Sequence, residues 1–72
     1  MTKRMIYPMV AYYMSVRGMN MKEMADKAHL NRATMRRALI GETRIALADA
    51  FAIKDALGCE MEMEELFEER ES

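Results

Sequence analysis

The stretch Asn20–Gly41, NMKEMADKAHLNRATMRRALIG, carries two helix-start signals only eleven positions apart. Asn20 with Glu23 three residues later makes a capping box, in which each side chain accepts a hydrogen bond from the other residue's backbone N–H group. Asn31 is a second N-cap residue, because its side-chain oxygen can accept from the first turn of the helix that follows. Gly41 suits the left-handed conformation that ends many helices. These signals predict two helices of about two turns each, joined by a tight turn.

The second of these helices has two chemically different faces. With about 100° of rotation per residue, its apolar and basic residues fall on opposite sides. The apolar face consists of Met35, Ala38 and Leu39, and the other of Ala33, Arg36 and Arg37 with Arg32 at its edge. Such a helix fits the major groove of DNA, which admits one helix and in which arginine pairs bidentately with guanine.

The same stretch resembles the helix-turn-helix of phage repressors and Cro proteins, the lambda-repressor-like or Xre family. Ala25 matches the family's small residue where the two helices cross, and His29 stands where the family's turn usually carries glycine. The resemblance covers roughly residues 9–68 and implies an all-α fold, a compact bundle of about five short helices with a central helix-turn-helix. The other matching residues are Met24, Ala28, Leu30, Met35 and Gly41 in the motif, and Leu47, Phe51, Ile53, Leu57, Gly58, Leu66 and Phe67 beyond it.

Length and composition indicate one small domain. We expect residues 1–72 to form a single helix-turn-helix domain, with 1–7 as a lead-in and 69–72 as a frayed acidic tail. The longest uncharged stretch, residues 5–16, is shorter than the roughly 20 residues that span a membrane. The single Cys59 cannot form an internal disulfide, which fits a reducing cytosol and predicts a cytoplasmic protein.

The net charge of −1 hides an asymmetry along the chain. Residues 1–58 carry ten basic and five acidic side chains, whereas residues 59–72 carry one basic and seven acidic side chains. The basic part contains the two-faced helix, so the local charge balance is compatible with nucleic-acid binding although the total is near neutral.

Three more helices are expected around the central pair. One begins with Pro8 and runs to about Arg17, another runs from about Ala46 to Leu57, and each has a glycine directly after it. A fifth, of about two turns, contains Met63, Leu66 and Phe67, and either completes the core or carries a dimer contact. The expected core residues are Val10, Tyr13 and Met14 in the first helix, and a stripe of Leu47, Ala50, Phe51, Lys54 and Leu57 with Ile53 beside it.

The residues expected to contact DNA fall into two groups. Arg32, Ala33, Arg36 and Arg37 are candidates for base contacts, with Ala33 facing a thymine methyl group. Met21 and Lys22 at a helix start and Thr34 are candidates for phosphate contacts, and the resemblance adds Thr43 and Arg44. Alternatively, Thr34 bonds its own backbone and Arg44 is an ordinary solvated loop residue. Lys3 and Arg4 either contact phosphate or belong to a disordered start.

The sequence offers no chemistry for an enzyme. It contains no Ser/His/Asp set or phosphate-cradling glycine loop, and His29 has no partners at metal-ligand spacing, so we expect neither a metal nor a cofactor.

The leading hypothesis is a sequence-specific regulator that binds double-stranded DNA, acts Cro- or repressor-like by operator occupancy, and forms a homodimer on a near-palindromic site. The alternative is a protein-interaction module of the same fold, antitoxin-like or an anti-regulator partner, that uses the acidic C-terminal segment. A third reading is a small helical domain with merely exposed arginines.

Overall fold

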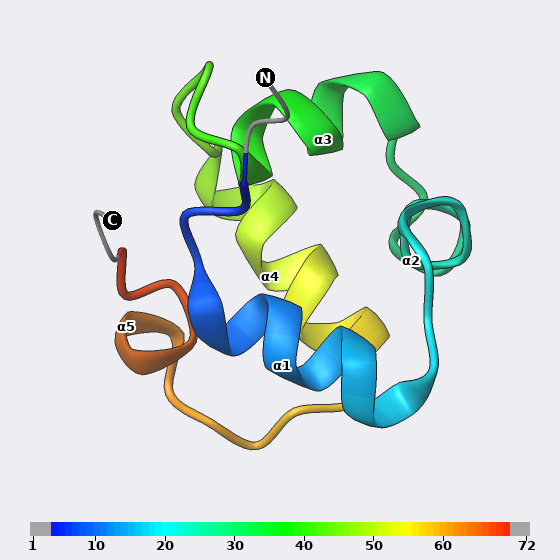
Figure 1. Ribbon diagram of the computed structural model, residues 1–72, viewed down its shortest axis with the longest axis vertical. Helices are drawn as coiled ribbons and strands as arrows, with labels where there is room; N and C mark the ends of the chain where they lie inside the picture. The colour runs from blue at the N-terminus through cyan, green and yellow to red at the C-terminus, as the bar shows by residue number, and fades with distance from the viewer. Residues whose placement is uncertain (1–3, 70–72) are drawn as a thin grey trace.

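The chain folds into five α-helices, and no strand occurs in the computed structural model, which describes residues 4–69. The helices are α1 Pro8–Arg17, α2 Met21–Ala28, α3 Arg32–Leu39, α4 Leu47–Leu57 and α5 Met63–Leu66. Figure 1 shows α4 passing behind α1 through the middle of the bundle, with α3 across one end and α5 at the side. Helix α2 packs against both α3 and α4, which makes the predicted helix-turn-helix part of the body of the fold.

The predicted caps set the ends of α2 and α3. The Asn20 side chain accepts from the Glu23 N–H at 2.8 Å, and the Glu23 carboxylate accepts from the Asn20 N–H at 3.1 Å. The Asn31 side chain accepts from the Thr34 N–H at 3.1 Å. These bonds satisfy backbone donors that have no partner inside the helix. Both helices are eight residues long, as the spacing of the caps predicted.

The first helix also ends as predicted, and residues 4–7, the described part of the expected lead-in, contact the rest of the bundle. Pro8 occupies its first turn, and Gly18 follows it in the left-handed conformation. The Ile6 N–H donates to the Leu39 carbonyl at 2.9 Å, and Tyr7 is only 4% exposed. The hydrogen bond from Ile6 therefore attaches residues 4–7 to the end of α3.

Every helix contributes at least one fully buried side chain to a single core. Burying a side chain of this size stabilises the fold by about 1.5–3 kcal/mol. The largest fully buried residues are Val10 of α1, Met24 of α2, Leu39 of α3, Ile53 and Leu57 of α4, and Leu66 of α5. The burial of Leu66 shows that α5 contributes to the core of the monomer. The alternative that α5 carries a dimer contact stays a prediction.

The expected core stripe of α4 is wrong at two positions. Leu47 is 69% exposed and Phe51 is 54% exposed, whereas Ala50, Ile53 and Leu57 face the core. Apolar residues occur on every side of this helix, LADAFAIKDAL, so hydrophobic periodicity does not distinguish its buried side.

Two smaller expectations also need correction. Tyr13 is half-buried at the edge of the core and is not inside it. Helix α5 has four residues, about one turn, because the acidic residues after Phe67 have no apolar side chain to bury. Lys3 and the last three residues of the expected tail lie outside the described residues. Among residues 4–69, no helix combines the length and the apolarity that crossing a membrane requires.

Candidate nucleic-acid interface

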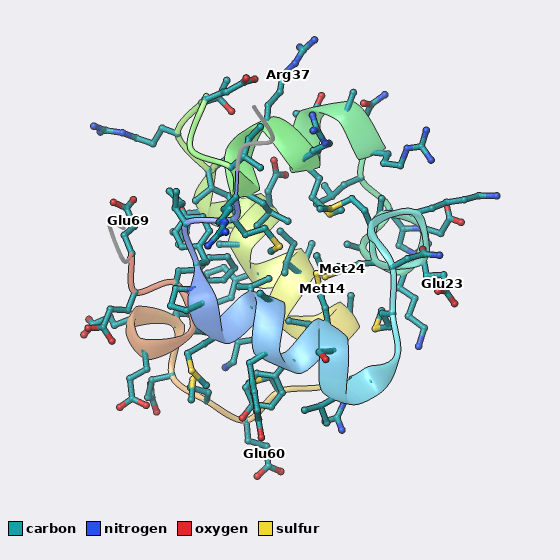
Figure 2. All side chains as sticks on the ribbon, in the orientation of Figure 1. Met14, Glu23, Met24, Arg37, Glu60 and Glu69 are labelled. Carbon is teal, nitrogen blue, oxygen red and sulfur yellow. The ribbon has the colours of Figure 1, made fainter. Side chains whose placement is uncertain are left out.

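Helix α3 presents its guanidinium groups to solvent. Met35, Ala38 and Leu39 are 2%, 5% and 0% exposed, which confirms the predicted inward face. The residues proposed for base contacts, Arg32, Ala33, Arg36 and Arg37, are all exposed. Figure 2 shows Arg37 extending from α3 away from the body of the molecule. The fold therefore buries one face of α3 in the core and leaves the opposite face exposed.

The turn between α2 and α3 fixes the angle at which α3 is presented. His29 adopts φ 58° and ψ 39°, a left-handed conformation that suits the glycine which the family usually carries at this position. The Leu30 N–H donates to the Ala25 carbonyl at 2.9 Å and the His29 N–H to the Asp26 carbonyl at 3.3 Å, which closes the end of α2. Ala25 is 2% exposed, so a small side chain lies at the close crossing.

The start of α2 is the first of the expected phosphate sites. The Met21 and Lys22 N–H groups lie in the first turn, where no carbonyl of the same helix can accept from them. Lys22 is exposed, and Met21 is half-buried. The Glu23 carboxylate occupies the same helix start, because it completes the capping box. This negative charge offsets part of the attraction that the helix end offers to a phosphate.

The loop between α3 and α4 carries the second group of expected phosphate contacts. Thr43 and Arg44 are both exposed there. The loop turns at Gly41, whose φ is 84° and where a Cβ atom would lie 3.2 Å from Ile6. The Glu42 N–H then donates to the Arg37 carbonyl at 2.9 Å, which folds the loop back against the end of α3. Thr34 lies on the first turn of α3, and its side chain is also exposed.

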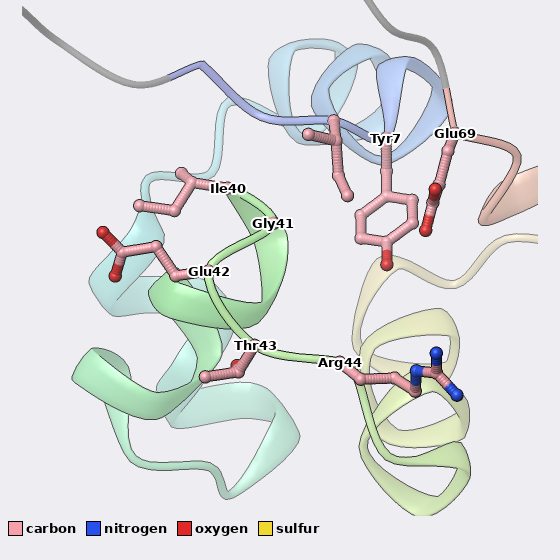
Figure 3. Close-up of a pocket in the computed structure, with 8 residues that line it drawn as sticks. Tyr7, Ile40, Gly41, Glu42, Thr43, Arg44 and Glu69 are labelled. Atoms are coloured by element: carbon pink, nitrogen blue, oxygen red, sulfur yellow. The ribbon is translucent and has the colours of Figure 1, made fainter.

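An open cleft of about 420 Å³ lies between this loop, the N-terminal segment and the C-terminal segment. Figure 3 shows Tyr7 in this cleft beside Glu69, with Thr43 and Arg44 on the loop at its edge. Burial raises the pKa of the Tyr7 hydroxyl, and the negative charge of Glu69 raises it further. The phenol therefore stays neutral near neutral pH and forms no anionic site.

The C-terminal segment carries a group of exposed acidic residues. Figure 2 shows Arg37 and Glu60 at opposite ends of the molecule. The exposed acidic residues of this region are Glu60, Glu62, Glu64, Glu65, Glu68 and Glu69. Within residues 4–69, the acidic segment therefore leaves the arginines of α3 uncovered. No group of three or more potential metal ligands occurs in the same part of the chain.

Two features of the surface were not predicted from the sequence. The Arg17 side chain donates from Nε to the Leu57 carbonyl at 3.0 Å and from Nη2 to the Gly58 carbonyl at 3.4 Å, so it caps the end of α4. The other feature is the exposure of Leu47 and Phe51. Neither has a local sequence signal, because each depends on how distant helices pack.

Together, α2, its left-handed turn and the two-faced α3 define a helix-turn-helix protein. The chain belongs to the family of Cro/C1-type HTH DNA-binding domains, whose family model matches residues 10–68 and thus reaches from α1 past α5. No curated protein and no solved structure matches the chain.

Proposed function

We propose that this protein is a sequence-specific regulator of transcription that binds double-stranded DNA and acts, like Cro and repressor proteins, by occupying an operator. The observation that carries the proposal is the two-faced α3: its apolar face is buried, and its arginines are exposed on the other side. Membership of a family of DNA-binding domains supports the same function. The proposal involves occupancy of DNA and no catalysis.

Helix α3 reads the bases in this proposal. Arg32 and Arg36 are four residues apart, and neighbours at this spacing lie on one side of a helix. Each arginine that pairs bidentately with guanine contributes about 1–3 kcal/mol of discrimination against another base. Ala33 is small enough to let the helix approach closely and to contact a thymine methyl group. Arg37 contacts a base edge or an adjacent phosphate.

Phosphate contacts on both sides of α3 fix its position in the groove. Met21 and Lys22 contribute at the start of α2, Thr34 at the start of α3, and Thr43 and Arg44 from the following loop. Such contacts carry no sequence information but set register and orientation. They also make affinity fall with salt, with a slope of about −0.9 per phosphate neutralised.

Two copies acting together explain how so small a domain gains specificity. The molecule measures 29 × 24 × 23 Å, which is less than the roughly 34 Å of one turn of duplex DNA. One copy therefore reads a single half-site. A homodimer related by a two-fold axis would read two half-sites about one turn apart, which requires a near-palindromic operator.

Selection of bound sequences from a random duplex pool tests this function. We expect enrichment of a site with two inverted half-sites whose centres are about 10 base pairs apart. Enrichment of no sequence, together with no binding to genomic fragments even at low salt, would contradict the proposal. That result would favour the interaction-module alternative.

A further inference from the structure

We propose that the exposed flank of α4 is the surface through which two copies of this chain associate; this inference rests on the proposed function and identifies its dimer contact. The flank contains a ridge, formed by Leu47 and Phe51, which are 69% and 54% exposed. They are one turn apart on α4, so their side chains are neighbours. Water-exposed leucine and phenylalanine side chains placed side by side favour burial against a partner.

Two hollows border the ridge. One, of about 260 Å³, lies between α4 and α5 and is lined by Ile45, Leu47, Ala50, Met63, Glu64 and Phe67. The other, of about 240 Å³, is lined by Phe51, Lys54, Asp55, Gly58 and Cys59. A two-fold interface must be complementary to itself, because the same patch supplies both sides. This patch meets that condition, since it carries a projecting aromatic ring and an apolar hollow next to each other.

The charges around the patch favour one arrangement of the second copy. Lys54 and Asp55 follow Phe51 by about one turn and line the second hollow with it, whereas Glu64 is the charged residue among those that line the hollow between α4 and α5. If Phe51 of one copy enters that hollow of the other, Lys54 comes close to the partner's Glu64, and the two-fold axis repeats the pair. The same exchange places α4 against the partner's α5, which supplies Met63, Glu64 and Phe67 to the hollow.

The position of the patch is also compatible with DNA binding by both copies. Figure 1 shows α4 beginning at the end of the bundle that carries α3 and running away from it. No residue of α2 or α3 lines either hollow, so association leaves the arginines of α3 uncovered. The ridge consists of two large apolar side chains, and interfaces of less than about 1,200 Å² are typical of weak, transient complexes. We therefore expect weak association in solution that strengthens on a two-half-site duplex.

Sedimentation equilibrium of the full chain without DNA, over about 10 µM to 1 mM, tests the surface. Leu47→Glu should weaken association by about tenfold or more, because it places a charge at the centre of the patch. The fold should tolerate this change, since Leu47 begins α4 and an acidic residue in a first turn interacts favourably with the helix dipole. Phe51→Glu provides a second variant with the same expected result.

Tyr12→Glu is the matched control, because Tyr12 is 56% exposed on α1 and lies outside the patch. It should associate like the wild type. Lys54→Glu should also weaken association, and adding Glu64→Lys should restore it. A wild type that stays monomeric throughout, or Leu47→Glu and Phe51→Glu variants that associate normally, would overturn the inference.

Binding to DNA separates this inference from the proposed function. Leu47→Glu should bind a single half-site like the wild type but lose cooperative binding to two half-sites. A protein that associates through the patch and binds no DNA would refute the function and leave the surface standing. Cooperative DNA binding unaffected by both α4 substitutions would refute the surface and leave the function standing.

Discussion

At the scale of single residues, His29 is the position whose residue type fits its backbone conformation least well. It is the only non-glycine residue with positive φ among residues 4–69. A residue with a Cβ atom is strained in this conformation, although histidine is penalised less than most. The sequence predicted the left-handed turn, because the resemblance places a glycine there. The packing of α2 and α3 on the core holds His29 in this conformation.

Replacing His29 with glycine should stabilise the protein. We expect His29→Gly to raise the free energy of unfolding by about 0.5–1 kcal/mol, because glycine adopts this conformation without strain. Thermal unfolding should show a rise in Tm of about 2–8 °C. Gly41→Ala is the opposite control: its φ of 84° and the 3.2 Å approach to Ile6 predict a loss of stability. An unchanged or lower Tm for His29→Gly would show that the histidine ring makes compensating contacts.

At the scale of secondary-structure elements, the sequence predicts helices best where side chains cap the backbone. The starts of α1, α2 and α3 follow from Pro8, Asn20 and Asn31, and the ends of α1 and α3 from Gly18 and Gly41, since capping depends on residues only a few positions apart. The inward face of α3 was predictable because its arginines contrast with its apolar residues. Helix α4 lacks that contrast, so its exposed ridge required the packed structure.

The start of α2 allows a test of phosphate binding that leaves the helix intact. Glu23→Gln keeps the capping box, because glutamine can accept the same hydrogen bond, and it removes one negative charge. If a phosphate binds the Met21 and Lys22 N–H groups, affinity should rise by about two- to fivefold at low salt. Glu60→Gln is the matched control, since Glu60 is exposed at the end of the molecule opposite Arg37. Equal effects of the two substitutions would argue against a phosphate at this helix start.

At the scale of the whole molecule, the fold separates two regions of opposite charge. Arg32, Arg36 and Arg37 are exposed on α3 and Arg44 on the following loop, whereas the exposed acidic residues of the C-terminal segment lie on and around α5. The sequence predicted this separation from the order of charges along the chain. It did not predict that Ile6 bonds the end of α3 or that Arg17 caps α4, because both contacts join residues more than 30 positions apart. Such long-range contacts depend on the complete packing of the bundle.

The central claim is that α3 reads DNA with its exposed face. The most direct test measures two properties of the Arg36→Ala protein: its affinity for the duplex that the wild type selects, and its thermal stability. Arg36 is exposed, and its side chain packs into no core, so stability should be nearly unchanged. Affinity for the selected site should fall roughly ten- to hundredfold. Lys27→Ala, an exposed cation on α2 outside this face, should have a much smaller effect. Unchanged affinity of Arg36→Ala, or a large loss of stability in its place, would contradict the account.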